Sequence, residues 1–224
     1  MNEEHIIEML QEAYNFKPCP TIISEEVLPC KIEESGVYKI KGKINIDKPA
    51  ILINNADNVI IRGEKGIFKS EIDSPLPIIV NNSNYVKIEN IGLSGRGNVM
   101  ILDSNKVTIE RCIFKFTEES IFSKNVNKID IKNSYVNASV NNLFFDSMNT
   151  QYIYIENVKS NRDVDIDIEN SNTVEIIKSK TFNLNLKNVD KVIIIDTEVK
   201  NQTYENINFL NINEKEREIK FASV

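Results

Sequence analysis

The chain has 224 residues, 41% of them hydrophobic, and its 27 basic and 33 acidic residues give a net charge of −6. This length allows a sizeable core, and the acidic balance predicts no general affinity for nucleic acid or for anionic membranes. We find neither a secretory signal nor an apolar run long enough to span a membrane. We therefore expect a cytoplasmic or virion-associated protein.

The N-terminal segment, residues 1–30, is predicted to be a cap helix with a connector. Residues 3–16 place apolar side chains on one helical face and acids at the start, and Lys17-Pro18 would end that helix. Cys19 and Cys30 flank a Pro-containing loop and could form a disulfide, although a cytoplasmic location disfavours one. Both states of this pair stay open at this point.

Residues 31–224 are organised by an internal repeat. The phrase Asn/Asp-x-Asn/Asp-x-Val/Ile-x-Ile occurs seven times, with a spacing near 22 residues. Its strand begins at Val59, Val86, Val107, Ile129, Ile153, Val174 and Val192. A second strand with alternating apolar residues precedes each phrase and a weaker third strand follows it. Three short strands per repeat, with no helix between them, predict an all-β parallel β-helix of about eight coils.

The repeated phrase, together with the opening segment CKIEESGVYKIKGKI at residues 30–44, resembles the right-handed parallel β-helix, pectate-lyase-like superfamily. The resemblance runs from about Cys30 to the C-terminus and concerns the fold. It implies a single-stranded right-handed solenoid whose functional residues lie on outward-facing columns. That superfamily includes lyases, hydrolases, viral tail proteins and non-catalytic scaffolds, so the fold alone does not choose among these functions.

The asparagines of the phrase are interpreted as corner residues. Asn82 and Asn84, in the stretch NNSNYVKIEN, would lie at the bend between two strands, where asparagine tolerates left-handed backbone geometry. Equivalent asparagines in successive coils should stack into ladders, because each side-chain amide both donates and accepts hydrogen bonds. We expect these ladders to satisfy the backbone groups of the turns.

One outward cluster is a candidate for catalysis. The residues are Lys132, Asp130, Glu110, Tyr154 and Glu156, which the repeat places on neighbouring strands of one sheet. The superfamily's lyases use a basic residue and cation-binding acids on such a surface, which makes a carbohydrate-active or carbohydrate-binding protein the alternative function. The competing interpretation is an ion-pair ladder of Glu110, Lys132 and Glu156 in water. The single histidine makes triad and zinc chemistry improbable.

The preceding strand carries two further candidate surfaces. Its outward column begins with an apolar stripe of Leu52, Ile79, Met100 and Phe122, which either seats the N-terminal helix or binds a protein partner or a second copy. Higher in the same column, Asp146 and Asp167 lie one coil apart and could share a Ca²⁺ ion, or they belong to a solvated acidic patch. No other cofactor is expected.

Three functions follow from these surfaces. The first is a non-catalytic structural or binding β-helix that uses the apolar stripe or the acidic face to hold a protein partner or itself. The second is the carbohydrate-active alternative, with or without Ca²⁺. The third is an acidic mimic of nucleic acid that occupies a DNA-binding protein, a role for which a net charge of −6 is modest.

Overall fold

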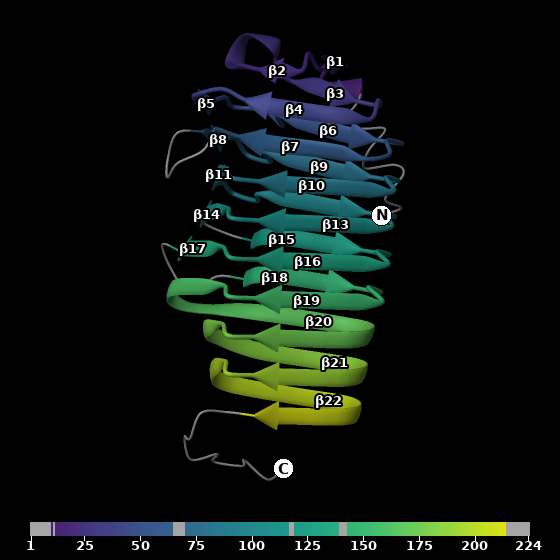
Figure 1. Cartoon of the computed structure of the whole chain (residues 1–224), viewed down its shortest axis with the longest axis vertical. Helices are drawn as coiled ribbons and strands as arrows, with labels where there is room; N and C mark the ends of the chain where they lie inside the picture. The colour runs from purple at the N-terminus through teal and green to yellow at the C-terminus, as the bar shows by residue number, and fades with distance from the viewer. Residues whose placement is uncertain (1–9, 11, 65–69, 117–118, 139–142, 214–224) are drawn as a thin grey trace.

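The protein is a parallel β-solenoid of about nine turns, as the computed structural model shows (Figure 1). The structure describes residues 10, 12–64, 70–116, 119–138 and 143–213. Each turn passes over three faces, called face A, face B and face C in the order in which the chain meets them after residue 50. Every strand pairs in parallel with the strand one turn above or below it.

The strands of the first turns are short and separate. Those of face A are β3 (Cys30–Ile32), β6 (Ile51–Asn54), β9 (Ile78–Asn81), β12 (Val99–Leu102), β15 (Glu119–Lys124) and β18 (Leu143–Met148). Those of face B are β4 (Gly36–Ile40), β7 (Val59–Gly63), β10 (Tyr85–Glu89), β13 (Lys106–Glu110), β16 (Lys128–Lys132) and β19 (Tyr152–Glu156). Those of face C are β5 (Lys43–Asn45), β8 (Glu71–Asp73), β11 (Gly92–Gly95), β14 (Ile113–Phe116) and β17 (Tyr135–Ala138).

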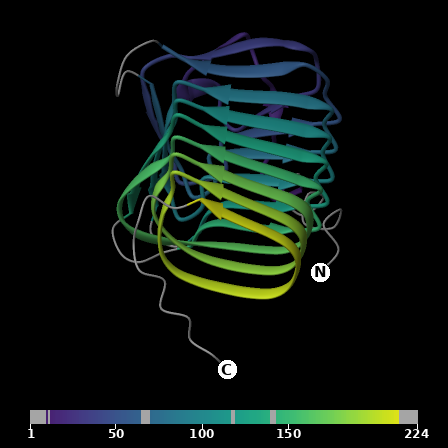
Figure 2. The same ribbon diagram turned by 60° about the horizontal axis from the view of Figure 1, so that its bottom comes forward.

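The last turns have no such interruptions. The strands β20 (Lys159–Ile177), β21 (Lys180–Ile195) and β22 (Glu198–Asn213) each run over all three faces as one continuous strand. Figure 2 shows these turns from the C-terminal end, with β22 in yellow at the free end of the stack.

The register predicted from the repeat is confirmed. Val86 pairs with Val59 and Val107, and Ile129 pairs with Val107 and Ile153, so equivalent residues form vertical columns. The inward columns fill one continuous core, in which the ring of Phe144 lies 5.4 Å from that of Phe114 and 6.1 Å from that of Phe182. Because strand side chains alternate with period two, the intervening residues face outward and carry the candidate sites.

The predicted asparagine ladders are confirmed at the corners between face A and face B. Residues with left-handed backbone recur there in eight successive turns, namely Asn55, Asn82, Asp103, Asn125, Asn149, Asn170, Asn188 and Asn206. The Nδ2 of Asn82 donates to the Oδ1 of Asn55 over 2.6 Å, and Asn188 donates to Asn170 over 2.9 Å. A second ladder joins Asn84 to Asn105.

The ladders do not satisfy the turn backbone as expected. The backbone N–H of Asn84 donates to the carbonyl of Ala56 in the turn below, and that of Ala56 donates to the buried hydroxyl of Ser83. The ladder amides instead bond to one another, because side chains with left-handed backbone at these corners point away from the core. Backbone bonds and buried hydroxyls therefore hold the corners, and the exposed amides add a second, outer row.

The predicted N-terminal α-helical cap is not supported. No α-helix with defined bounds occurs in the part of the chain that the structure describes, where helical conformation is limited to Leu10, Glu12 and Ala13. Residues 3–9 and 11 of the predicted helix lie outside that part. The first turn is built from β1 (Lys17–Pro18), which pairs with β3, and β2 (Ile22–Ile23), which pairs with β4. A single 3-10 turn, Glu25–Val27, follows them. This irregular turn lacks the asparagine phrase, which is why the sequence indicated one turn fewer.

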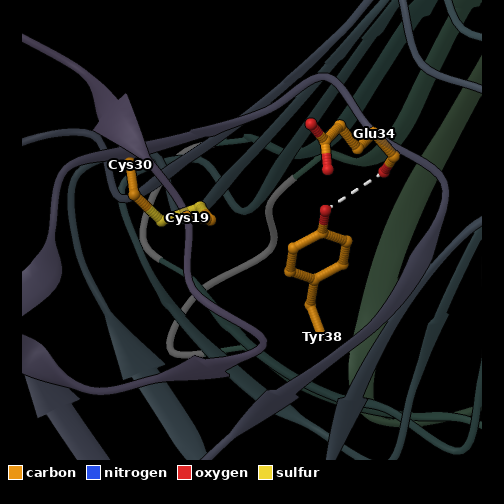
Figure 3. Close-up of a disulfide and its surroundings, with 4 residues drawn as sticks. All are labelled: Cys19, Cys30, Glu34 and Tyr38. Carbon is orange, nitrogen blue, oxygen red and sulfur yellow. Dashed lines mark hydrogen bonds between the residues drawn. A yellow bond between two sulfur atoms is a disulfide. The ribbon is translucent and has the colours of Figure 1, made fainter.

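The disulfide left open by the sequence is formed between Cys19 and Cys30 (Figure 3). It joins the first turn to β3, next to Tyr38, whose hydroxyl donates to the carbonyl of Glu34 over 3.1 Å. The third cysteine, Cys112, is buried, and burial raises the pKa of its thiol to about 12. Among the described helical residues, none belongs to a helix long and apolar enough to cross a bilayer.

Candidate functional site

The cluster predicted for catalysis on face B is assembled as the register requires. Glu110, Lys132 and Glu156 lie in one column on β13, β16 and β19, and Asp130 pairs with Tyr154 in the neighbouring column. Asp130 is only 4% exposed although it points outward, because the longer side chains around it cover it. The five residues therefore form one contiguous surface.

Asp130 is held between lysine–tyrosine pairs. The Nζ of Lys128 lies 3.4 Å from the Oδ1 of Asp130, within ion-pair range but not aligned as a hydrogen bond, so that buried oxygen has no hydrogen-bond partner. The same Nζ lies 4.5 Å from the ring centre of Tyr152, and that of Lys132 lies 4.8 Å from the ring centre of Tyr154. In both cation–π contacts the lysine belongs to the turn that precedes the tyrosine in the chain.

The lysine contacts decide what the tyrosines can bind. A lysine of the adjacent turn lies over one face of each ring and occupies that face. A sugar ring would need an open aromatic face to stack upon. The pKa of Tyr152 is raised to about 12, first by burial and then by a hydrogen bond with Glu175 and the charge of Glu175. The hydroxyl of Tyr152 therefore stays protonated near neutral pH.

The ion pairs of face B lie nearer the N-terminal end of the stack than predicted. Glu89, 2% exposed, pairs with Arg62, with Lys87 over 3.0 Å and with Arg111 over 2.7 Å. Burial tends to raise the pKa of Glu89, but hydrogen bonds from Lys87 and Arg62 outweigh it and hold the pKa below its usual value. Among the described residues, Lys132 makes no ion pair with Glu110 or Glu156, so the predicted three-residue ladder is not formed.

On face A, Asp146 and Asp167 lie in register on neighbouring turns, as predicted. A third carboxylate, Glu119 at the start of β15, joins them. Burial and the charges of Asp146 and Asp167 raise the pKa of Glu119 to about 7. Burial and the charge of Asp167 also raise the pKa of Asp146, and burial and the charge of Asp165 raise that of Asp167. We call Glu119, Asp146 and Asp167 the acidic cluster.

Two lysines pair with acids beside this cluster. Asp163 contacts Lys200 over 2.8 Å, and Glu169 contacts Lys187 over 3.5 Å. No ion pair within the described residues reaches the acidic cluster itself, and one oxygen of Glu119 is buried without a hydrogen-bond partner. In the same part of the chain, no three acids, cysteines or histidines are arranged to hold a metal ion.

The apolar stripe of face A lies in register but is not open to solvent. Leu52 and Ile79 are fully buried, and Met100 and Phe122 are half-buried. The residues packed against this group include two from the N-terminal segment and two from the turns, namely Leu10, Phe16, Leu76 and Leu102. The part of the stripe nearest the N-terminal end of the stack is thus covered by the chain's own N-terminal segment.

Two hollows were not predicted from the sequence. The larger, about 1020 Å³, opens at the N-terminal end of the stack beside the 3-10 turn, between acids and lysines that include Glu25 and Lys43. The smaller, about 460 Å³, lies on face C beside Ser94, Gly95 and Arg96. Gly95 has a φ of +152°, and a side chain there would collide with the carbonyl of Ser74. The glycines clustered at residues 92–97 were the available sequence signal for this hollow.

Taken together, the fold and its surfaces define the class of protein, a parallel β-solenoid with asparagine-laddered corners. Comparison with protein-family models, with curated proteins and with solved structures finds no match. The class is therefore established from the fold, and the function has to be argued from the surfaces described above.

Proposed function

We propose that the protein is a non-catalytic binding solenoid that holds a basic protein partner on the acidic cluster of face A. The observation that carries this proposal is the crowding of Glu119, Asp146 and Asp167, which have no cation partner among the residues that the structure describes. Like charges that raise one another's pKa cost stability, and such arrangements concentrate at functional sites. A partner that brings lysine or arginine to this face would offset that cost and be steered towards it.

The rigidity of the stack supports the same role. The turns that carry Asp146 and Asp167 are paired along all three faces, and the ladder bond from Asn170 to Asn149 joins them at the corner, so the spacing between the two aspartates is set by the strand register. A preformed row of charges loses little conformational entropy on binding. The geometry suits recognition of an extended basic segment better than it suits a reaction that needs a closing groove.

A titration with a synthetic peptide rich in lysine and arginine tests the proposal. We expect binding to the full-length chain, weaker at high salt than at low salt because exposed charges are screened. The double variant Asp146→Asn with Asp167→Asn should weaken binding at least about tenfold. The matched control, Asp57→Asn with Asp73→Asn, makes the same change in net charge at exposed positions elsewhere. Equal weakening by both double variants would refute a specific site.

A calcium titration separates the cation interpretation from the protein partner. The three side chains of the acidic cluster, with Glu119 only partly ionised near pH 7, are few ligands for Ca²⁺, which takes six to eight oxygens. We expect no calorimetric heat and no change in melting temperature on addition of Ca²⁺. A clear heat that disappears in Asp146→Asn would replace the partner proposal with a metal site.

The second candidate function is a carbohydrate-active or carbohydrate-binding surface at Asp130 and Lys132. The buried, unpartnered oxygen of Asp130 favours it, and the covered ring faces of Tyr152 and Tyr154 weigh against it. Turnover of polygalacturonate or a similar polymer, lost in Lys132→Ala, would establish this alternative. We rank it second because the acidic cluster carries three perturbed groups, whereas Asp130 already lies beside Lys128.

Two finer assignments belong with these proposals. Membership of the right-handed, pectate-lyase-like superfamily rests on the resemblance of the repeated phrase and the opening segment. The disulfide supports a virion surface or an oxidising compartment over a reducing cytoplasm, since thiol-reducing systems disfavour such bonds.

A further inference from the structure

The last turn of the stack presents a free strand edge. On one side β22 pairs in parallel with β21 over all three faces. On its other side, no strand of the described part of the chain pairs with it, as Figure 2 shows at the yellow end. Its outer row of backbone N–H and C=O groups can therefore bond to another strand, and such edges are templates for association.

The same end exposes core side chains. Leu210 continues the inward column of Val174 and Val192, which are fully buried, yet Leu210 is 44% exposed. Ile207 continues the inward position of the buried Val189 and is only half-buried, whereas Phe209, 51% exposed, lies in the outward column of Thr173 and Lys191. These are large apolar side chains in one strand at one end of the stack, and covering them would be favourable by the usual hydrophobic gain.

The usual protection against edge pairing is weak on β22. Natural edges are protected by charge, proline or bulges. The charged residues of β22 are Glu198, Lys200 and Glu205, a net charge of −1, and it contains no proline. Its register with β21 shifts on both sides of Phe182 and is regular from the Asn183–Asn201 pair onward. Lys200 already pairs with Asp163 on a lateral face. Two copies of this strand could therefore approach each other without strong charge repulsion.

The asparagine ladders have a direction that also ends at β22. The Nδ2 of Asn206 donates to Asn188 and that of Asn208 donates to Asp190, in each case towards the N-terminal end of the stack. Asn201 donates to Asn183 in the same sense. Their amide oxygens are thus left as acceptors at the open end, where N–H groups of a docked strand could reach them.

We propose that β22 is a homotypic interface, at which a second copy of the chain docks C-terminal turn to C-terminal turn. A second β22 offers an edge of equal length and matching cross-section, which an isolated strand does not. Docking of two C-terminal turns gives a dimer with two-fold symmetry, in which the facing strands run antiparallel. Such an assembly is complete with two copies and does not grow into a fibre. Head-to-tail growth is opposed at the N-terminal end, where Pro18, Pro20 and the 3-10 turn interrupt the edge.

Sedimentation equilibrium of the full-length chain over a wide concentration range tests this interface. We expect a dimer of twice the 25.7 kDa chain mass. Leu210→Lys should raise the dimer dissociation constant at least about tenfold. The matched control Ile193→Lys, on the lateral surface of the preceding turn, should leave the dimer dissociation constant unchanged. Circular dichroism of each variant establishes that it is folded, and Ile207→Glu provides a second variant among the inward residues of the same edge.

Cysteine cross-linking locates the contact. Because Cys112 is buried and Cys19 is bonded to Cys30, a cysteine introduced by Asn211→Cys is the accessible thiol at the C-terminal end. Mild oxidation should give a covalent dimer with Asn211→Cys and none with Lys41→Cys at the other end. A chain that stays monomeric at all concentrations overturns the inference. Residues 214–224 or another partner would then be the occupant of this edge. Such a result leaves peptide binding at the acidic cluster unaffected, so the two proposals fail separately.

Discussion

The two halves of the stack solve the same folding problem with different chemistry. All six prolines, all seven glycines and the disulfide lie within the first 97 residues, and the ion-pair network around Glu89 extends from Arg62 to Arg111. From β20 onward the turns are continuous, and asparagine amides join successive corners. The N-terminal half therefore has irregular turns joined by specific cross-links, and the C-terminal half has a uniform repeat.

This difference indicates where function is to be sought. In the N-terminal half, buried carboxylates such as Glu89 are matched by cations in the same sheet. In the C-terminal half, the acidic cluster has no cation partner among the described residues, and Leu210 remains exposed at the end. Surfaces that satisfy themselves stabilise the fold, whereas surfaces left unsatisfied can gain from binding.

The largest expected effect separates the middle of the core from its open end. Ile153 and Leu210 occupy the same inward column, but Ile153 is fully buried. Ile153→Ala should lower the free energy of unfolding by about 2–5 kcal/mol because it leaves a cavity. Leu210→Ala should cost about 1 kcal/mol or less, since half-exposed side chains contribute less burial. Chemical denaturation at low protein concentration measures both, and equal costs would show that the end is closed.

The second prediction concerns the disulfide of the first turn. Cys19 and Cys30 are separated by 11 positions, a loop for which chain-entropy arguments give about 2–3 kcal/mol of stabilisation. The double variant Cys19→Ser with Cys30→Ser should lower the free energy of unfolding by about this amount. Hydrogen exchange should quicken in β1 to β4 and stay unchanged in β20 to β22. Uniform loss of protection along the stack would contradict the independence of the two halves.

The sequence predicted the parts of the fold that depend on the repeat. Vertical neighbours such as Asp146 and Asp167 follow directly from the register, because one column of the repeat is one column of the solenoid. The first turn could not be predicted in this way, since its strands are two residues long and held by a disulfide. The apolar side chains of Leu10 and Phe16, which the sequence assigned to a cap helix, pack against the apolar stripe of face A.

The candidate sites were predicted less completely than the fold. Glu119 lies outside the column of Asp146, and a register shift between Leu143 and Phe145 alters the alignment next to it. The approach of its side chain to Asp146 therefore depends on side-chain conformation, which the repeat does not encode. The same holds for the lysines that lie over Tyr152 and Tyr154. The register places Lys128 in the column of Tyr152 and Lys132 in the column next to that of Tyr154, but it does not determine their cation–π contacts.

The third prediction uses the pH dependence of stability to compare the halves. Because the pKa of Glu119 is raised from 4.5 to about 7, the folded state retains a proton that the unfolded chain has released in this window. The free energy of unfolding should therefore fall as pH rises from about 4.5 to about 7. After allowance for the solvent exposure of Glu119, the loss should be about 1–2 kcal/mol.

Glu119→Gln should remove most of this pH dependence, because glutamine does not titrate. Glu89 has the opposite sign, since its pKa is lowered and its stabilising contribution is lost when pH falls through that lowered value. The control Glu89→Gln should therefore leave the slope between pH 4.5 and 7 in place. Thermal unfolding across this range measures both variants, and a flat profile for the unmodified protein would exclude the raised pKa of Glu119.

The smallest expected effect tests the asparagine ladder itself. Asn125 donates to Asp103 over 2.9 Å and accepts from Asn149 over 3.2 Å, and its φ is +55°. Asn125→Ala removes these bonds and also places a β-carbon in left-handed backbone, so it should cost about 1–2 kcal/mol. Asn125→Gly removes the same bonds without that strain, and it should cost about 0.5–1 kcal/mol.

Asn206 supplies the comparison at the open end. It has the same left-handed backbone, with a φ of +54°, but within the described residues its ladder contact is the single bond to Asn188. Asn206→Gly should therefore destabilise the monomer by less than Asn125→Gly does, because one bond is lost instead of two. If the two glycine variants cost the same at low protein concentration, the ladder amides contribute nothing measurable, and the corners are held by backbone bonds and buried hydroxyls alone.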